Sequence, residues 1–337
     1  MNLGWGAVLA LSTFAAMGVP AKTTLAADKV RVSLAAMDDP AYLPNFVAID
    51  KGYYRELNLD VDVVHLGGGI ATPALLSESI DFSTSTGSAT SAVLAGAKLK
   101  IVMTLSESVP WKLWATRPEI KTLQDLKGKP VGIQSRGDLF ELSMRALLMK
   151  AGLDGDSVVY MPLGFGNALR LGVIQTGSLP AVLLSNFEEK IARERGLLER
   201  AHMLVDLGKE IRVPNNGLAS SDKLLATNPS VVERFVRATL MGGWYTKVQR
   251  EGTLRIFAKR VPDVPLHVLR ESIDETATSM LESGTTSLTT QQSEIALRSS
   301  MNDLPPQRVP APSGVFNYSL AIEAVQRLKA SNWMPTE

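Results

Sequence analysis

The sequence contains no cysteine, and this absence removes several kinds of chemistry. Without thiols the chain forms no disulfide, thiolate zinc site, iron–sulfur cluster or cysteine nucleophile. Histidine is also scarce, because His65, His202 and His267 are too scattered for a local metal motif. No H-E-x-x-H, P-loop or G-x-S-x-G pattern is present, and Leu169 replaces the third glycine of a dinucleotide fingerprint after Gly164. We therefore expect no catalytic residue, metal or cofactor, and no enzyme activity.

The sequence also lacks an excess of basic or of acidic side chains. The chain has 35 basic and 34 acidic side chains, a formal net charge of +1. A nucleic-acid binder would carry a basic excess, so we expect no nucleic-acid partner. Apolar residues make up 45% of the sequence and charged residues 20%, which is typical of a globular protein. At 337 residues, with about 100–200 residues per domain, the length favours two domains.

The first 21 residues carry no charged side chain. The stretch from Trp5 to Met17 is mostly apolar and is followed by small residues up to Ala27. This pattern is typical of a secretory signal peptide, so we predict a leader over residues 1–27, cleaved near Ala26 or Ala27. No later run is apolar enough to span a membrane. We expect an exported, periplasmic protein.

From Lys29 onward, strand and helix patterns alternate. A first cycle runs to about Leu105, and a second, weakly similar cycle runs from about Thr116 to Leu184. Alternation of this kind predicts parallel sheets covered by helices, here in two α/β lobes. After the segment Pro214–Gly217 the pattern becomes helical. We predict one helix from Pro229 to about Gly242 and another from Tyr245 to Lys259.

Loops that follow the predicted strands carry the candidate ligand-binding residues, because ligands of open α/β sheets bind beyond the carboxyl ends of the strands. Backbone N–H groups at helix starts there also suit anions, although the same residue types are common in turns and caps. Arg136 is the only cation in the set. The candidates are Asp38, Asp39, Tyr42, Gly68, Gly69, Ser83, Thr84, Ser85, Thr86, Ser135, Arg136, Asp138, Asn167, Ser185, Asn186 and Phe187.

Four segments together resemble the periplasmic solute-binding proteins of ABC importers of the nitrate, sulfonate and taurine type, a group that includes thiamine-pyrimidine precursor binders. These segments are Ala48–Val61, Leu76–Phe82, Ile120–Ile133 and Gln175–Ala181. The sequence departs from the family pattern at Glu78, where glycine is usual, and at Pro180, where aspartate is usual.

The resemblance implies a two-lobe type II periplasmic-binding fold, with a ligand cleft between lobes joined by two crossover strands. Lobe 1 would comprise residues 28–114 and 217–337, including the last helices, and lobe 2 residues 115–216. The chain would cross near Trp114–Pro118 and return near Arg212–Gly217. The implied partners are a small-molecule ligand and the transmembrane subunits of an ABC permease, and the expected state is a monomer.

We predict that closure of the two lobes captures a small organic anion, and a heterocycle is the alternative. Arg136 and the helix starts favour a small organic anion, a sulfonate or carboxylate. The acidic pair Asp38–Asp39, with aromatic rings available for stacking, favours a thiamine-pyrimidine-like heterocycle. The stacking candidates are Tyr42, Trp111, Trp114, Phe165 and Phe187. An alternative from another class is a thiamine-pyrimidine synthase, which has this fold but uses a cysteine-rich stretch.

Overall fold

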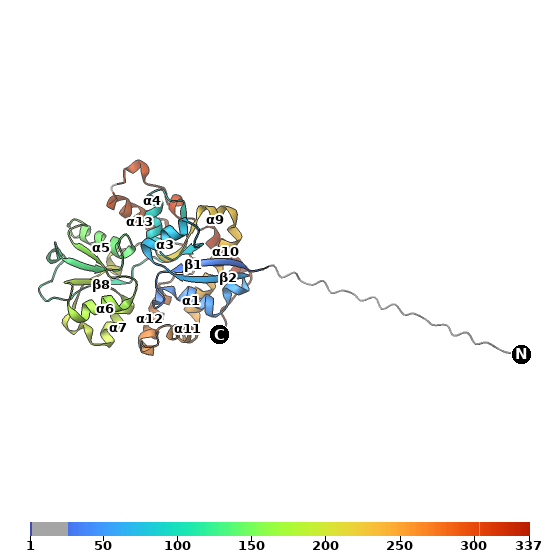
Figure 1. Ribbon diagram of the computed structural model, residues 1–337, viewed down its shortest axis with the longest axis horizontal. Coiled ribbons are helices and arrows are strands. Elements are labelled where there is room, and N and C mark those ends of the chain that lie inside the picture. Colours follow the sequence, from blue (N-terminus) through green and yellow to red (C-terminus); the bar gives the residue numbers. More distant parts are fainter. Residues whose placement is uncertain (2–25, 303) are drawn as a thin grey trace.

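The computed structural model describes residue 1, residues 26–302 and residues 304–337. The predicted leader therefore falls almost wholly outside the described residues. The described chain forms two lobes, each built on its own five-stranded sheet (Figure 1). A search of the described part finds no helix with the length and apolar character needed to cross a membrane.

The first sheet has the strand order β2-β1-β3-β10-β4. Its strands are β1 (Asp28–Leu34), β2 (Leu59–His65), β3 (Phe82–Ser83), β4 (Leu99–Ser106) and β10 (Asn215–Ser221). Strand β1 pairs in parallel with β2 and β3, whereas β10 runs antiparallel between β3 and β4. The buried face of β1 presents Val30, Val32 and Leu34, as the alternating sequence predicts.

The second sheet repeats this plan with the order β7-β6-β8-β5-β9. Its strands are β5 (Trp111–Ala115), β6 (Pro130–Ile133), β7 (Val159–Pro162), β8 (Ala181–Ser185) and β9 (His202–Asp206). Strand β6 pairs in parallel with β7 and β8, and β5 runs antiparallel between β8 and β9.

One antiparallel central strand in each sheet differs from the parallel sheets that we predicted. Strands β5 and β10 are the first strands that the chain forms in a sheet after it crosses from the other lobe, so they enter in the opposite direction. The crossings consequently lie at residues 107–110 and 211–214. Trp111–Ala115 belongs to the second sheet, which differs from the predicted crossing near Trp114–Pro118. Strand β10 begins within the predicted return crossing, Arg212–Gly217, and its last residues extend into the stretch that we predicted as helical.

The helices cover both faces of the sheets (Figure 1). Those of the two alternating cycles are α1 (Leu43–Asp50), α2 (Tyr53–Glu56), α3 (Gly68–Leu76), α4 (Thr86–Leu94), α5 (Leu139–Lys150), α6 (Asn167–Thr176), α7 (Asn186–Glu194) and α8 (Leu207–Glu210). Those of the tail are α9 (Asp222–Thr227), α10 (Pro229–Val248), α11 (Arg250–Ala258), α12 (Leu266–Ser279), α13 (Leu288–Met301), α14 (Pro312–Val315) and α15 (Ser319–Ala330).

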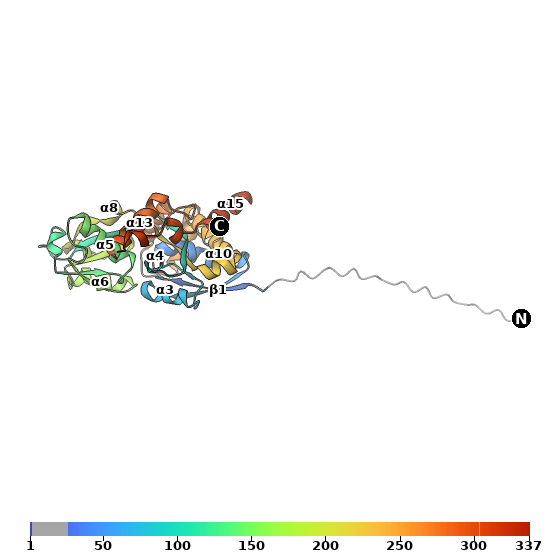
Figure 2. The same cartoon turned by 90° about the horizontal axis from the view of Figure 1, so that it is seen from above.

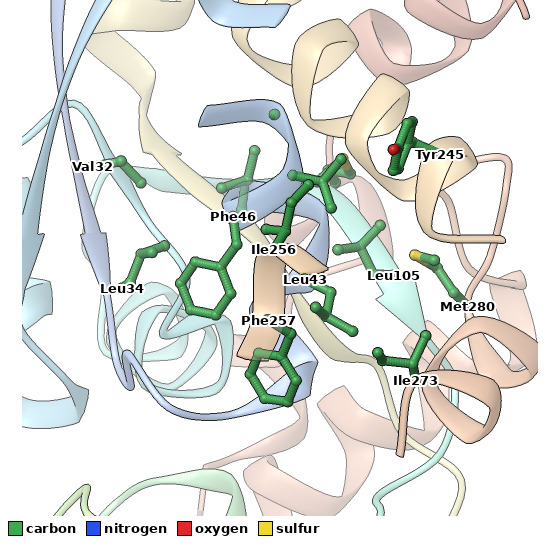
Figure 3. Close-up of a cluster of buried hydrophobic side chains, with 14 of the residues drawn as sticks. Val32, Leu34, Leu43, Phe46, Leu105, Tyr245, Ile256, Phe257, Ile273 and Met280 are labelled. Carbon is green, nitrogen blue, oxygen red and sulfur yellow. The ribbon is translucent and has the colours of Figure 1, made fainter. Parts of the chain in front are cut away.

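The core of the first lobe forms where α1 packs against α10 and α11. Phe46 of α1 and Phe257 of α11 are fully buried there, beside Leu43 (Figure 3). Burying a side chain of this size contributes roughly 1.5–3 kcal/mol. Helix α13 is not confined to the first lobe as we predicted for the last helices. Its Leu297 and Met301 pack against the core of the second lobe, and α13 lies beside α5 in both views (Figures 1 and 2).

Candidate functional site

A cavity of about 90 Å³ lies between the two lobes. Its wall from the first lobe comes from the loops after β1 and β3 and from the start of α3, and its wall from the second lobe comes from the loops after β6 and β7. These are carboxyl ends of strands, the place where the sequence predicts the ligand. The polar and aromatic residues of the lining are Asp39, Tyr42, Thr84, Ser85, Thr86, Ser88, Trp111, Gln134, Asp138, Phe140, Phe165, Arg170, Asn215 and Asn216.

A second cavity, of about 150 Å³, adjoins the first. The two share Asp39, Ala41, Pro110, Asn215 and Asn216, so they are neighbouring parts of one cleft. The second cavity extends along the crossings toward α12 and takes in the start of α7. The cleft therefore has an inner compartment rich in aromatic side chains and a compartment lined by hydroxyl and amide groups.

The structure brings ten of the sixteen candidates to these two cavities. Asp39, Tyr42, Gly68, Thr84, Ser85, Thr86 and Asp138 line the first, and Ser185, Asn186 and Phe187 line the second. Asp38 lines a separate outer groove, where its Oδ2 accepts a hydrogen bond from Asn167 Nδ2 at 3.1 Å. The candidates Ser83, Gly69, Ser135 and Arg136 line neither cavity. Ser83 is buried and bonds Ser33 Oγ at 3.0 Å instead.

Arg136, the predicted anion ligand, points away from the cleft. Its side chain is 54% exposed, and its Nη1 lies 3.4 Å from Glu141 Oε1. Gly137, with φ of 73°, turns the backbone immediately after it. The arginine that lines the cavity is Arg170 of α6, which the sequence analysis missed. Its Nε donates to Glu188 Oε1 at 2.7 Å and its Nη1 to the carbonyl of Gly164 at 2.5 Å, so its charge is already compensated.

Aromatic rings make up much of the first cavity. Trp111 of β5 stacks on Phe140 of α5 with ring centroids 3.9 Å apart, and Phe165 closes the cavity from the loop before α6. Of these, Trp111 and Phe165 were stacking candidates and Phe140 was not. Trp114, another stacking candidate, packs in the core. Planar heterocycles stack well on such rings.

Carboxyl groups set the electrostatics of the cavity. Asp39 caps the turn at Pro40–Tyr42, and burial, together with the negative charges of Glu188 and Asp38, raises its pKa to about 6. Asp138 caps α5 through Oδ1, which accepts from the N–H of Glu141 at 3.0 Å. Burial raises the pKa of Asp138 to about 7, with Glu141 adding to the rise. Two carboxyl groups beside one compensated arginine give a lining that disfavours anions.

Contacts between the lobes hold the cleft closed. On one side, Asp38 meets Asn167, and the ring of Phe165 lies so close to Gly67 that a Cβ at Gly67 would stand 2.4 Å from its Cζ. On the other side, Asn186 and Lys190 of α7 both bond the carboxylate of Glu275 on α12, and these helices lie together in Figure 1. About 90 Å³ is below the ~300–1,000 Å³ usual for ligand sites, so a ligand of ordinary size needs the lobes to part.

Comparison with known proteins identifies relatives of this chain. Residues 39–249 match the protein family described as NMT1/THI5 like. The riboflavin-binding protein RibY of Chloroflexus aurantiacus is 26% identical over 266 residues, which are 73% of this chain and 72% of RibY. That RibY binds riboflavin is a property of RibY, and at this identity its ligand is not transferred here.

Solved structures share the fold. The alkanesulfonate-binding protein SsuA of Xanthomonas axonopodis pv. citri, bound to MOPS, has a TM-score of 0.68 at 18% identity, covering 86% of this chain and 98% of SsuA. The periplasmic nitrate-binding protein NrtA of Synechocystis has a TM-score of 0.71 at 14% identity, covering 92% of each chain. The desulfurization enzyme DszB also has this fold, with a TM-score of 0.60 at 14% identity over 89% of this chain and 99% of its own. The fold is that of the periplasmic binding proteins, a fold that both binders and enzymes use.

Proposed function

The chain belongs to the NMT1/THI5-like family, and from its cleft we propose that it is the solute-binding subunit of an ABC importer that captures a planar heterocycle. The periplasmic-binding fold and the closed interlobe cleft support the binding role. A ligand that touches both lobes stabilises the closed form in proportion to its differential affinity for that form. The closed form would then dock, as a monomer in the periplasm, on the transmembrane subunits of the permease.

The residues that line the first cavity are our reason for proposing a heterocycle as the ligand. Trp111, Phe140 and Phe165 supply aromatic surface, and Asp39 and Asp138 supply acceptors for ring N–H or amino groups. A ring that donates hydrogen bonds to carboxylates and stacks on aromatic faces satisfies both features. The similarity to a riboflavin-binding protein is consistent with a heterocycle of this kind.

A small organic anion, the ligand that we predicted first from the sequence, becomes the second candidate, favoured by the fold shared with an alkanesulfonate-binding protein. The cleft supports it less well. Arg170 is the lining cation, and it already bonds Glu188, while Arg136 lies outside the lining. An anion would also face the carboxylate of Asp39 in a buried setting, where like charges repel strongly.

An enzyme of the thiamine-pyrimidine synthase class is the alternative from another functional class. The sequence contains no cysteine, so the cysteine-rich stretch of those enzymes has no counterpart here. The described residues include no cluster of three or more histidine or acidic side chains arranged to hold a metal. We therefore propose capture of the ligand rather than its conversion.

A thermal-shift screen of the chain from Asp28 onward, refolded to strip bound ligand, tests this function. Riboflavin, thiamine, a simple aminopyrimidine, ethanesulfonate and nitrate form the panel. A ligand at 100 times its dissociation constant adds about 2.7 kcal/mol of stability, a clear melting shift. We expect a heterocycle to give this shift. A shift with ethanesulfonate or nitrate alone would replace the heterocycle by an anion, and turnover of any hit would overturn the binding role.

A variant ties the hit to the cleft. Phe165→Ala removes a partly exposed aromatic wall, and loss of one stacking contact costs about 1–3 kcal/mol, so we expect the heterocycle to bind roughly tenfold more weakly. Leu169→Ala removes an exposed apolar side chain from the same stretch of chain, outside both cavities, and serves as the matched control. Equal weakening by both variants would contradict binding at the cleft.

A further inference from the structure

The second cavity has a chemistry unlike that of the first. Its lining includes the hydroxyl groups of Ser106, Ser108, Ser272 and Thr276 and the amides of Asn186 and Asn216. Of the aromatic residues, the lining contains only Phe187, among the residues the structure describes. A ligand group placed there would meet hydrogen-bonding partners on most sides rather than flat apolar surface.

One of these partners is left without a hydrogen bond. Asn186 donates from Nδ2 to Glu275, but its Oδ1 is buried and accepts no hydrogen bond from any described residue. A buried acceptor in this condition is destabilising, and a hydrogen bond from a ligand O–H removes that cost. The residue stands at the start of α7, where the second lobe borders the cavity.

The charges of the cavity restrict what that ligand group can be. Asp39, Asp206 and Glu275 line it, and the described lining contains no lysine or arginine. Lys190 bonds Glu275 and Lys209 lies 3.9 Å from Asp206 Oδ2, which leaves Asp39 as the carboxyl of the lining without an ion-pair partner among the described residues. A phosphate or carboxylate there would be repelled without a compensating cation, whereas a neutral hydroxyl donates to these oxygens.

We propose that the ligand is a planar heterocycle bearing an uncharged, hydroxylated chain. Once the lobes have parted enough to admit it, its ring packs against the lining of the first cavity and its chain against the lining of the second. The shared residues Asp39, Asn215 and Asn216 join the two compartments, so one molecule spans both. This inference rests on the proposed function, since it assigns a substituent to the ligand of the same cleft. It adds a specificity rule: the cleft selects the dephosphorylated compound and rejects its phosphate ester.

Three flavins that share one ring system test the rule. Lumiflavin carries the ring with a methyl group, riboflavin adds a ribityl chain, and flavin mononucleotide ends that chain in a phosphate. Quenching of flavin fluorescence gives a dissociation constant for each. We expect riboflavin to bind at least tenfold more tightly than lumiflavin and at least tenfold more tightly than flavin mononucleotide.

Each departure from this order has a distinct meaning. Equal affinities for lumiflavin and riboflavin would overturn the chain subsite while keeping ring capture, the proposed function. Equal affinities for riboflavin and flavin mononucleotide would overturn the rejection of phosphate. Failure of all three to bind overturns this inference, and a sulfonate or nitrate hit in the thermal screen would then overturn the heterocycle function as well.

A second measurement uses a variant in which a larger side chain fills the second cavity. Ser108→Leu places a larger apolar side chain in the second cavity, and we expect the ratio of the lumiflavin and riboflavin dissociation constants to fall toward one. Ser300→Leu adds the same side chain to an exposed position of α13 and should keep the wild-type ratio. Thermal melting of both variants checks that they fold. A Ser108→Leu ratio equal to that of the wild type would place the chain elsewhere.

Discussion

At the scale of single residues, Asp138 gives the cleft a dependence on pH. The residue is 6% exposed, and its buried Oδ2 has no hydrogen-bond partner among the described residues. With a pKa near 7 in the folded chain and about 3.8 when unfolded, it holds its proton in the folded state across this range. The folded state then binds more protons than the unfolded state, so its stability falls as pH rises from about 4 to about 7.

We expect Asp138→Asn to remove this part of the decline, because the amide keeps the helix cap and does not ionise. Between pH 5 and pH 8 the wild type should lose about 2–3 kcal/mol more stability than the variant. Urea unfolding at several pH values measures the difference. Asp125→Asn is the control, since the pKa of exposed Asp125 is lowered by hydrogen bonds and it stays ionised throughout this range. Parallel curves for the wild type and Asp138→Asn would contradict the raised pKa.

Arg136 and Arg170 show which features of the cleft could be predicted from the sequence and which could not. Strand-end loops could be predicted from the sequence, and Asp39, Thr84 and Asp138 of these loops line the cavity. Arg136 stands on such a loop, yet Glu141 and the face of Tyr160 hold it outside. Arg170 lies inside a helix, and the direction it faces depends on its Glu188 partner, 18 residues away. Contacts between segments decide which of two arginines turns inward, and no local pattern encodes them.

At the scale of elements, the glycine pair in α10 explains a wrong boundary. We predicted a helix end near Gly242, but α10 continues to Val248. A Cβ at Gly242 would lie 2.0 Å from the carbonyl oxygen of Pro44, so the glycine lets α1 and α10 approach closely. Glycine in a helical pattern thus marked a packing contact here, not a helix end. The sequence contains no signal that separates the two cases.

The same pair of glycines supplies a prediction with its own control. Gly242→Ala drives a methyl group into the backbone of α1, and we expect a loss of roughly 3 kcal/mol or more, measured by urea unfolding. In Gly243→Ala the new Cβ would lie 3.2 Å from the sulfur of Met280, whose side chain can shift. We therefore expect this variant to have nearly the stability of the wild type. Similar losses in the two variants would mean that helix propensity or mobility, rather than α1–α10 packing, controls this site.

At the scale of the whole molecule, closure of the two lobes is the motion on which the function depends. The two-lobe α/β plan was predictable because the alternation of strands and helices repeats along the chain. The positions of the crossings were not, since β5 and β10 acquire their strand character from sheets formed by other segments. The contacts that join the lobes are likewise invisible locally. Asp38 and Asn167 lie 129 residues apart, and their hydrogen bond exists only when the cleft is closed.

Gly67 offers a direct test of closure. Its φ of −120° suits any residue, so alanine fits the first lobe without backbone strain. Across the cleft, however, the new Cβ would stand 2.4–2.6 Å from three ring atoms of Phe165. Gly67→Ala should therefore destabilise the closed form while leaving each lobe folded. Gly69→Ala is the matched control, because a Cβ there meets no heavy atom of the described chain within 4 Å.

Because the sequence contains no native cysteine, labels attach only at cysteines introduced to measure the separation of the lobes. Labels on Leu76→Cys of α3 and Leu169→Cys of α6, both exposed, report the separation of the lobes by energy transfer or spin-label distances. We expect Gly67→Ala to shift the ligand-free chain toward longer distances and Gly69→Ala to match the unsubstituted chain. Adding Phe165→Ala to Gly67→Ala should restore the shorter distances, because the clashing ring is gone. If the Gly67→Ala distribution matches the control, the contact between Gly67 and Phe165 does not govern closure, and the lobes close through the α7–α12 side of the cleft instead.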